Sequence, residues 1–273
     1  MGTDAGRKEH YVHGYEEWTR RWMTTRTAER ELAFLMPHLA PGRRVLDCGC
    51  GPGSITVGLA RAVMPADVIG IDIEPRQLET ARSLAAEGNI GNVRFEEGSI
   101  YEIPFPDASF DVAVAHFVIE HVSDPGRALR EMRRVLRPGG VAAIKDPYYP
   151  AFVFRPRTPE VALFQELMAR WQESNGASTT YAADLRAHLL DAGFSRTEAS
   201  GGMETVAGTG EIAAVFRMII ENQVRDTAFR QSVITHGWAT EAQMDAISES
   251  AAEFAKRPDV FGFIVFVQAL GFV

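Results

Sequence analysis

The stretch that decides the fold is V-L-D-C-G-C-G-P-G-S, residues 45–54. A short apolar run leads into three glycines at alternate positions. An apolar helical pattern begins directly after them, at Ile55, Val57 and Leu59. This order of strand, tight glycine turn and helix leaves the backbone bare where a ligand can approach it closely. We therefore expect an α/β sheet with a ligand site at this turn.

Two classes of cofactor use glycine turns, and the spacing here separates them. A dinucleotide fingerprint reads G-x-G-x-x-G, whereas this turn reads G-x-G-x-G and Ser54 stands where the last glycine would be. Asp47 lies just before the first glycine, where a fixed carboxylate repels a pyrophosphate and attracts a cation. S-adenosylmethionine carries a sulfonium and an ammonium but no phosphate. The charge therefore favours S-adenosylmethionine over NAD.

A second acid stands at the end of the next predicted strand. Asp72 follows the apolar run at residues 68–71, about twenty residues beyond the glycines, the spacing of an acid that binds ribose hydroxyls. The alternative is a solvated acid at a strand end, but the preceding glycine turn favours ribose binding.

Composition limits the partners and the compartment. The 273 residues carry a net charge of −8 with a pI near 5.4, which disfavours nucleic acid and anionic membranes. The two cysteines, Cys48 and Cys50, lack the spacing of a zinc site or of a disulfide framework. The first thirty residues are charged without an apolar leader, and the apolar run at 260–273 is too short to span a bilayer. We expect a cytoplasmic protein.

Strand and helix patterns alternate from Arg43 to Asp146, and then the alternation breaks. This predicts a single α/β domain with a Rossmann-like, seven-stranded, mostly parallel and doubly wound sheet, to which helical lid segments are added. We read residues 147–157 as a loop, with later strands ending near Met203 and Val267. The expected parts are an N-terminal helical cap (1–36), a cofactor-binding core (37–146), lid insertions (147–180 and 208–258) and segments that complete the sheet (181–207 and 259–273).

Several further motifs accompany the glycine turn and cover about half of the chain. They are G-I-D-I (70–73), P-F-P-D-A-S-F-D-V (104–112), I-E-H-V (119–122), E-M-R-R-V-L-R-P-G-G (131–140) and L-R-A-H-L-L-D-A-G-F (185–194). Together with V-L-D-C-G-C-G-P-G they resemble the class I S-adenosylmethionine-dependent methyltransferases. The resemblance is greatest to the branch that includes the ubiquinone/menaquinone-biosynthesis C-methyltransferases and many small-molecule methyltransferases.

The resemblance implies a role for each matching position. Asp47 and the turn backbone would hold the methionine end, Asp72 the ribose, and residues 98–100 the adenine edge. The family usually has an aspartate where this chain has Ser99, which weakens the predicted adenine contact. Tyr15 and Arg26 in the cap would bind the cofactor carboxylate, although Tyr15 fits ordinary helix packing equally well. The predicted cofactor residues are Tyr15, Arg26, Asp47, Gly49, Cys50, Gly51, Asp72, Ile73, Gln77, Gly98, Ser99, Ile100, His116 and Phe117.

Methyl transfer needs a base only when the accepting atom holds a proton at neutral pH. Six candidates fall near the ends of the fourth and fifth predicted strands: His116, Glu120, His121, Asp146, Tyr148 and Tyr149. We select His116 as the base, with Tyr148 as the second catalytic candidate, and a purely structural histidine as the alternative for His116. His10 and His13 have no acidic partners, so we expect no metal.

These patterns predict methyl transfer to carbon, nitrogen or oxygen of a small, partly apolar metabolite by a monomer or homodimer. One alternative is a protein of this fold that binds the cofactor without methylating. A nucleic-acid or protein methyltransferase is less favoured, because the chain is acidic and lysine is scarce. The D-P-Y-Y stretch (146–149) resembles the D-P-P-Y motif of base-modifying enzymes, yet it follows the fifth strand and lacks the second proline.

Overall fold

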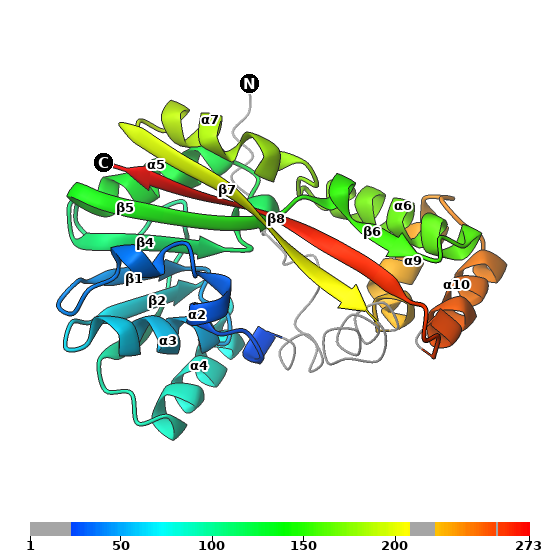
Figure 1. Cartoon of the computed structure of the whole chain (residues 1–273), viewed down its shortest axis with the longest axis horizontal. Helices are drawn as coiled ribbons and strands as arrows, with labels where there is room; N and C mark the ends of the chain where they lie inside the picture. Colours follow the sequence, from blue (N-terminus) through cyan, green and yellow to red (C-terminus); the bar gives the residue numbers. More distant parts are fainter. Residues whose placement is uncertain (1–22, 208–221, 255) are drawn as a thin grey trace.

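The computed structural model describes residues 23–207, 222–254 and 256–273, which form an α/β fold around one mixed sheet (Figure 1). The strand order is β3-β2-β1-β4-β5-β8-β6, and β7 pairs with the other edge of β8. The strands are β1 (Val45–Cys48), β2 (Val68–Asp72), β3 (Val93–Glu97), β4 (Phe110–His116), β5 (Leu136–Pro147), β6 (Val153–Arg155), β7 (Arg196–Ala207) and β8 (Phe261–Phe272).

The first five strands run parallel, whereas β6, β7 and β5 each pair antiparallel with β8. This confirms the predicted Rossmann-like, mostly parallel sheet. The difference from the sequence expectation is β6, which lies within the stretch 147–157 that we read as a loop. Its three residues are paired only with the far end of β8, a contact between segments more than one hundred residues apart that no local pattern indicates.

Helices cover both faces of the parallel part of the sheet. On β4, Val112 and Val114 pack into the core beneath α2 and α3, while Ala113 and Ala115 pack into the core beneath α5 and α7. These helices, with α4 beside β3, are α2 (Ala28–Glu31), α3 (Ser54–Val63), α4 (Pro75–Glu87), α5 (Pro125–Val135) and α7 (Leu185–Asp191). Single-turn 3-10 helices occur at η1 (Met36–His38), η2 (Ile119–His121), η3 (Tyr149–Ala151) and η4 (Tyr181–Asp184).

The register of β1 brings the predicted site residues to one edge. Asp47 lies beside Gly70 on β2 and beside Val114 on β4. The strand ends that follow, at Cys48, Asp72 and His116, therefore meet at the carboxyl edge of the sheet. Ligands bind at this edge in open α/β folds.

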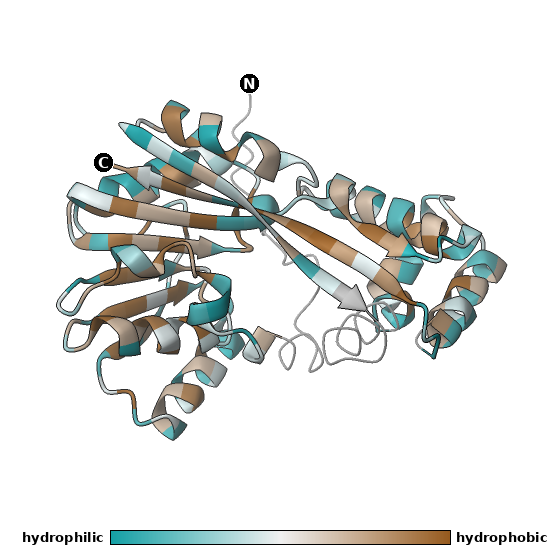
Figure 2. Ribbon diagram, in the orientation of Figure 1, coloured by the Kyte–Doolittle hydropathy of each residue, from teal (hydrophilic) through white to brown (hydrophobic). Residues whose placement is uncertain are grey.

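The β7–β8 ribbon extends the sheet far beyond β5. The two strands pair over twelve residues each, whereas β5 reaches only to Phe266 on β8. We expected both strands to end earlier, and their full length follows from pairing with each other. Figure 1 shows three helices at the far end of this ribbon: α6 (Pro159–Ser174), α9 (Thr227–Thr235) and α10 (Glu241–Phe254). Figure 2 shows hydrophobic residues along the extended part of β8.

These three helices have a core of their own. Phe164 and Trp171 of α6, Phe229 of α9 and Ile247 of α10 pack in one buried cluster, separate from the two clusters on the sheet. Tyr15 and part of the predicted 208–258 insertion lie outside the described residues. Across the residues that the structure does describe, no helix is long and apolar enough to cross a membrane.

Candidate active site

The glycine turn after β1 leaves no room for side chains. Gly49, Gly51 and Gly53 all have positive φ, at 70°, 52° and 80°. A Cβ atom on Gly49 would lie 2.6 Å from Cγ2 of Val118, and one on Gly53 would lie 2.6 Å from Cβ of Ala81. Both strain and collision therefore require glycine, so the backbone of the turn stays bare.

The backbone N–H groups of this turn are already used within the protein. Gly49 and Cys50 both donate to the carbonyl oxygen of Ile71, at 2.8 and 3.0 Å. Gly51 donates to Oδ2 of Asp72 at 2.8 Å, and Gly53 donates to the carbonyl oxygen of Cys50 at 3.1 Å. Since Pro52 has no N–H group, residues 49–53 keep none for a ligand. A phosphate needs such free donors, whereas an ammonium needs acceptors, so the turn suits a cation.

Asp72 connects the glycine turn to the end of β2 through a hydrogen bond. Besides the bond from Gly51, its Oδ1 accepts the N–H of Glu74 at 2.9 Å. Burial raises the pKa of Asp72, and these backbone donors oppose the rise. Each carboxylate oxygen has a further lone pair, so the group can accept two more hydroxyl donors. The next residue, Ile73, is 45% exposed and gives this edge an apolar surface.

Asp47 points into the interior between β1 and α3. It is 3% exposed, and its Oδ2 accepts the hydroxyl of Thr56 at 2.6 Å. Burial raises the pKa of Asp47 to about 6. The side chain thus joins strand to helix behind the turn, and its predicted contact with the cofactor stays a prediction.

Met23 lies against the glycine turn and was not predicted from the sequence. Its carbonyl oxygen accepts the hydroxyl of Ser54 at 2.9 Å, and its Cε lies 3.0 Å from where a Cβ on Gly51 would be. Its sulfur lies 3.8 Å from Nε2 of Gln77. Gln77 is 1% exposed, and its Oε1 has no partner among the described residues. The expected N-terminal cap was the only signal that could have indicated Met23.

The residues after β3 form a tight turn beside Asp72. Gly98 donates its N–H to the carbonyl oxygen of Asp72 at 3.1 Å. The hydroxyl of Ser99 accepts the N–H of Tyr101 at 3.2 Å, and Ile100 is buried in the core. The Ile100 side chain is therefore committed to packing, which leaves its backbone and Ser99 for the predicted adenine contact.

Phe117 is held in a strained conformation at the end of β4. Its φ is +57°, which is rare for a bulky residue, and its N–H bonds to the carbonyl oxygen of Lys145 at 2.8 Å. The ring stacks on His116 at 4.1 Å and on Phe266 at 5.3 Å, measured between ring centroids. The guanidinium of Arg26 lies 4.5 Å above the ring, so the two predicted residues Arg26 and Phe117 lie together.

His116 is tied into a buried ion network. Its Nε2 lies 3.2 Å from Oε2 of Glu31, and Nζ of Lys145 lies 2.6 Å from the same oxygen. Burial lowers the pKa of His116 to about 4. The ring is therefore neutral at neutral pH and already has a hydrogen-bond partner, which favours the structural alternative for this histidine.

Two other acids of the candidate group are almost fully buried near the ends of β4 and β5. Glu120 is 2% exposed and Asp146 is 0% exposed. Burial and the charge of Asp146 raise the pKa of Glu120, and burial raises the pKa of Asp146 to about 7. Of the tyrosines nearby, Tyr148 is half-buried against the sheet core, with its N–H on the carbonyl oxygen of Val265 at 2.9 Å. Tyr149 hydrogen-bonds to the Glu120 carboxyl group.

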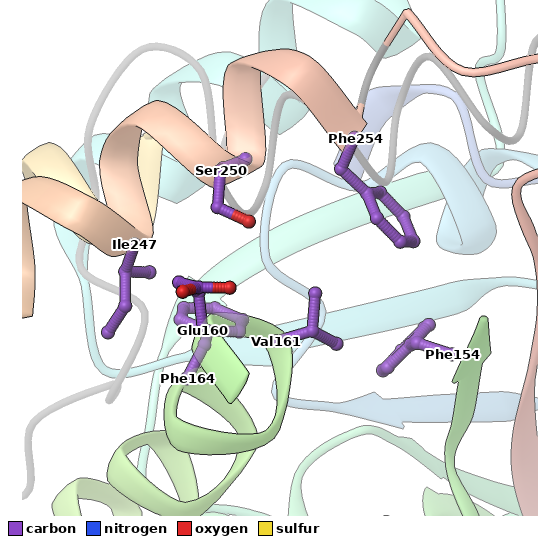
Figure 3. Close-up of a pocket in the computed structure, with 8 residues that line it drawn as sticks. Phe154, Glu160, Val161, Phe164, Ile247, Ser250 and Phe254 are labelled. Carbon is purple, nitrogen blue, oxygen red and sulfur yellow. The ribbon is translucent and has the colours of Figure 1, made fainter. Parts of the chain in front are cut away.

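A separate pocket lies within the helical unit. Figure 3 shows apolar side chains of β6, α6 and α10 around it, and Figure 1 places these elements at the far end of the β7–β8 ribbon from the glycine turn. Its lining residues are Phe154, Glu160, Val161, Phe164, Ile247, Ser250, Ala251 and Phe254. It is distinct from the carboxyl-edge site. No group of three or more potential metal ligands occurs in the described part of the chain.

Comparison with known proteins agrees with this geometry. Residues 39–202 match the family described as a methyltransferase domain. A methyltransferase of Schizosaccharomyces pombe, C1B3.06c, is 32% identical over 191 residues, which is 68% of each chain. The ubiquinone/menaquinone biosynthesis C-methyltransferase UbiE of Vibrio vulnificus is 40% identical over 114 residues, 41% of this chain and 44% of its own. Several curated relatives match over only about half of their own length.

The crystal structure of the YcgJ protein of Bacillus subtilis has the same fold. It superposes with a TM-score of 0.59 and 22% identity, covering 89% of this chain and 98% of that one. The carboxyl-edge site and the fold define a class I S-adenosylmethionine-dependent methyltransferase. This chain belongs to the methyltransferase domain family, as the motifs taken together predicted.

Proposed function

We propose that this chain binds S-adenosylmethionine at the carboxyl edge of β1 and β2 and transfers its methyl group to a small, partly apolar metabolite. The observation that carries the proposal is the use of every N–H group in residues 49–53 by Ile71, Asp72 and Cys50. A turn without free donors disfavours a pyrophosphate and leaves carbonyl oxygens for an ammonium group.

The residues of the site fit this cofactor. Asp72 would hold the ribose hydroxyls, and Ile73 would pack on the adenine. Gln77 has a buried oxygen without a partner among the described residues, which an amino group of the cofactor would satisfy. When bound, the cofactor supplies an activated methyl group on a positively charged sulfur.

The protein's own contribution is alignment and exclusion of water. The ring of Phe117 stacks on His116 and on Phe266, and the guanidinium of Arg26 lies 4.5 Å from its centroid. We expect His116 and Phe117 to line the floor beneath the methyl donor. A rigid apolar wall orients a small acceptor and keeps water from the reacting atoms.

The residues near the site and the charge of the chain favour a small molecule as the methyl acceptor. Aromatic side chains, namely Phe117, Tyr148, Tyr149 and Phe266, lie at or near the carboxyl ends of β4 and β5, and we expect them to line the acceptor site. The net charge of the chain is −8, which opposes a nucleic-acid strand. The name of UbiE refers to quinone biosynthesis, which agrees with a partly apolar acceptor. We also propose that the cap (1–36) and the insertions (147–180 and 208–258) close over the site as a lid.

Titration calorimetry with S-adenosylhomocysteine tests the proposal. We expect micromolar binding to the wild-type protein and loss of binding in Asp72→Ala, because the carboxylate holds both the turn and the ribose. Asp67→Ala is the matched control, since Asp67 precedes the same strand and its side chain is 54% exposed. Binding that is undiminished in Asp72→Ala, or absent in the wild-type protein, would overturn the proposal.

A further inference from the structure

We propose that Glu120 and Asp146 form the base of this enzyme and receive the proton of a hydroxyl group on the methyl acceptor. This inference rests on the proposed function and narrows it: the acceptor is a neutral molecule that presents an O–H group at this site. Both residues lie near strand ends at the carboxyl edge of the sheet, where the proposed methyl donor binds.

Asp146 is oriented by backbone donors that use only one side of its carboxylate. The N–H of Val118 donates to Oδ1 at 3.1 Å, and the N–H groups of Ile119 and Glu120 also hydrogen-bond to this group. The other oxygen, Oδ2, is buried and has no partner among the described residues. An unpaired buried carboxylate oxygen is costly, so a ligand that donates a hydrogen bond would be favoured there.

Glu120 shows the same division between a used and an unused oxygen. Tyr149 hydrogen-bonds to the Glu120 carboxyl group and Oε1 lies 3.3 Å from Nε2 of His121, whereas Oε2 has no partner within the described part of the chain. Its carboxyl group lies close enough to Asp146 for the charge of Asp146 to raise its pKa. The two acids therefore present two unsatisfied oxygens in one buried environment.

Two uncharged polar side chains, one at each end of the loop that contacts Glu120, are also unsatisfied. The hydroxyl of Tyr181 is buried and has no partner among the described residues, and it lies close enough to Asp146 for that charge to raise its pKa. Gln172, at 0% exposure, has neither its oxygen nor its nitrogen paired there. The loop between these residues lies on the acid pair, because Ser178 donates its N–H to the carbonyl oxygen of Glu120 at 2.8 Å.

One residue links this polar group to the glycine turn. Val118 donates its N–H to Asp146, and its side chain occupies the space beside Gly49, where a Cβ atom would lie 2.6 Å away. Val118 therefore contacts both Asp146 and the glycine turn, where we propose that the cofactor binds. His116, the base selected from the sequence, is instead bound to Glu31.

The methyl transfer and the proton transfer together conserve atoms and electrons. The acceptor oxygen forms a bond to the methyl carbon while the carbon–sulfur bond breaks, and the electron pair of that bond stays on sulfur. The hydroxyl proton passes to whichever acid of the pair is ionised, at Oδ2 of Asp146 or Oε2 of Glu120. Since burial raises the pKa of both groups, the pair is a stronger base than an exposed carboxylate. An alkylammonium acceptor has no free electron pair for the methyl carbon and would be held unreactive by the same acids.

Phenol and anisole are suitable probes, because anisole has the same ring but lacks the O–H group. Calorimetric titrations would use the full-length protein saturated with S-adenosylhomocysteine. We expect phenol to bind, and anisole to bind at least tenfold more weakly. In Glu120→Gln, Asp146→Asn and Tyr181→Phe the affinity for phenol is expected to fall at least tenfold, while S-adenosylhomocysteine binding stays within twofold of wild type. Glu87→Gln, an exposed acid at the end of α4, is the control variant.

The outcomes separate this inference from the proposed function. If the wild-type protein does not bind S-adenosylhomocysteine, the proposed function itself is wrong. If S-adenosylhomocysteine binds normally, three results would reject the acid pair alone. They are equal affinity for phenol and anisole, no binding of phenol, and unchanged phenol affinity in the three variants. Retained S-adenosylhomocysteine binding in each variant also shows that the variant is folded.

Discussion

Gly49 shows how a single residue limits what the turn can hold. Its φ of 70° and the 2.6 Å distance from a Cβ position to Val118 both oppose any side chain. We expect Gly49→Ala to lower the free energy of unfolding by about 2–4 kcal/mol, from left-handed strain and overpacking together. Urea denaturation would measure the change. Gly91→Ala is the control, because no atom lies within 4 Å of a Cβ there; equal effects of the two variants would contradict this reading.

Asp146 makes stability depend on pH. Its folded pKa of about 7 exceeds the model-peptide value of 3.8, so the folded state favours the protonated form. The contribution of Asp146 to the free energy of unfolding is present below pH 4 and is lost as the pH rises to about 7. We expect Asp146→Asn to remove this loss, so that the variant gains up to about 3–4 kcal/mol relative to wild type across that window.

The groups that face Asp146 are the Glu120 carboxyl, the Tyr181 hydroxyl and the backbone N–H groups of residues 118–120. Urea denaturation at pH 4, 5.5 and 7.5 would follow the difference between variant and wild type. The exposed Asp191→Asn provides a matched control. A difference between Asp146→Asn and wild type that is constant over the three pH values would show that Asp146 ionises normally.

At the scale of elements, α2 is fixed to the sheet by one buried acid. Glu31 bonds to Lys145 of β5 and His116 of β4, and these partners keep its pKa below its usual range. Glu31→Gln leaves a buried ammonium without its counter-charge, so we expect a loss of about 3–5 kcal/mol in the free energy of unfolding.

A double replacement tests whether charge is the cause. Glu31→Leu combined with Lys145→Met removes both charges, and apolar pairs often substitute for buried ion pairs without loss. We expect the double variant to recover most of the stability that Glu31→Gln loses. If Glu31→Gln is within 0.5 kcal/mol of wild type, α2 is held by packing alone.

The elements that sequence predicted best are those with local signals. The turn at residues 45–54 is encoded by consecutive residues, and the expected helix, α3, follows it directly. The strand β6, the full length of β7 and β8, and the Glu31–Lys145 pair depend on partners far along the chain. Glu120 and Asp146 were among the base candidates, but their burial and their unpaired oxygens could not be seen in the sequence.

At the scale of the whole molecule, the β7–β8 ribbon joins the sheet, with its buried clusters, to the helical unit of α6, α9 and α10, which has a separate cluster. Phe229 is fully buried in the core of α6, α9 and α10, with its ring 5.3 Å from that of Trp171. We expect Phe229→Ala to destabilise this helical unit by about 3–5 kcal/mol. Hydrogen exchange should accelerate in α6, α9 and α10 and stay unchanged in β1, β2 and β4. Equal acceleration in both regions would show that the two cores unfold as one.

The central claim is that a glycine turn without free donors, next to Asp72, binds a positively charged nucleoside in preference to a pyrophosphate. Parallel calorimetric titrations of the wild-type protein with S-adenosylmethionine and with NAD test it most directly. We predict micromolar binding of S-adenosylmethionine and no measurable heat with NAD. Binding of NAD with equal or greater affinity, or no binding of S-adenosylmethionine, would contradict the account.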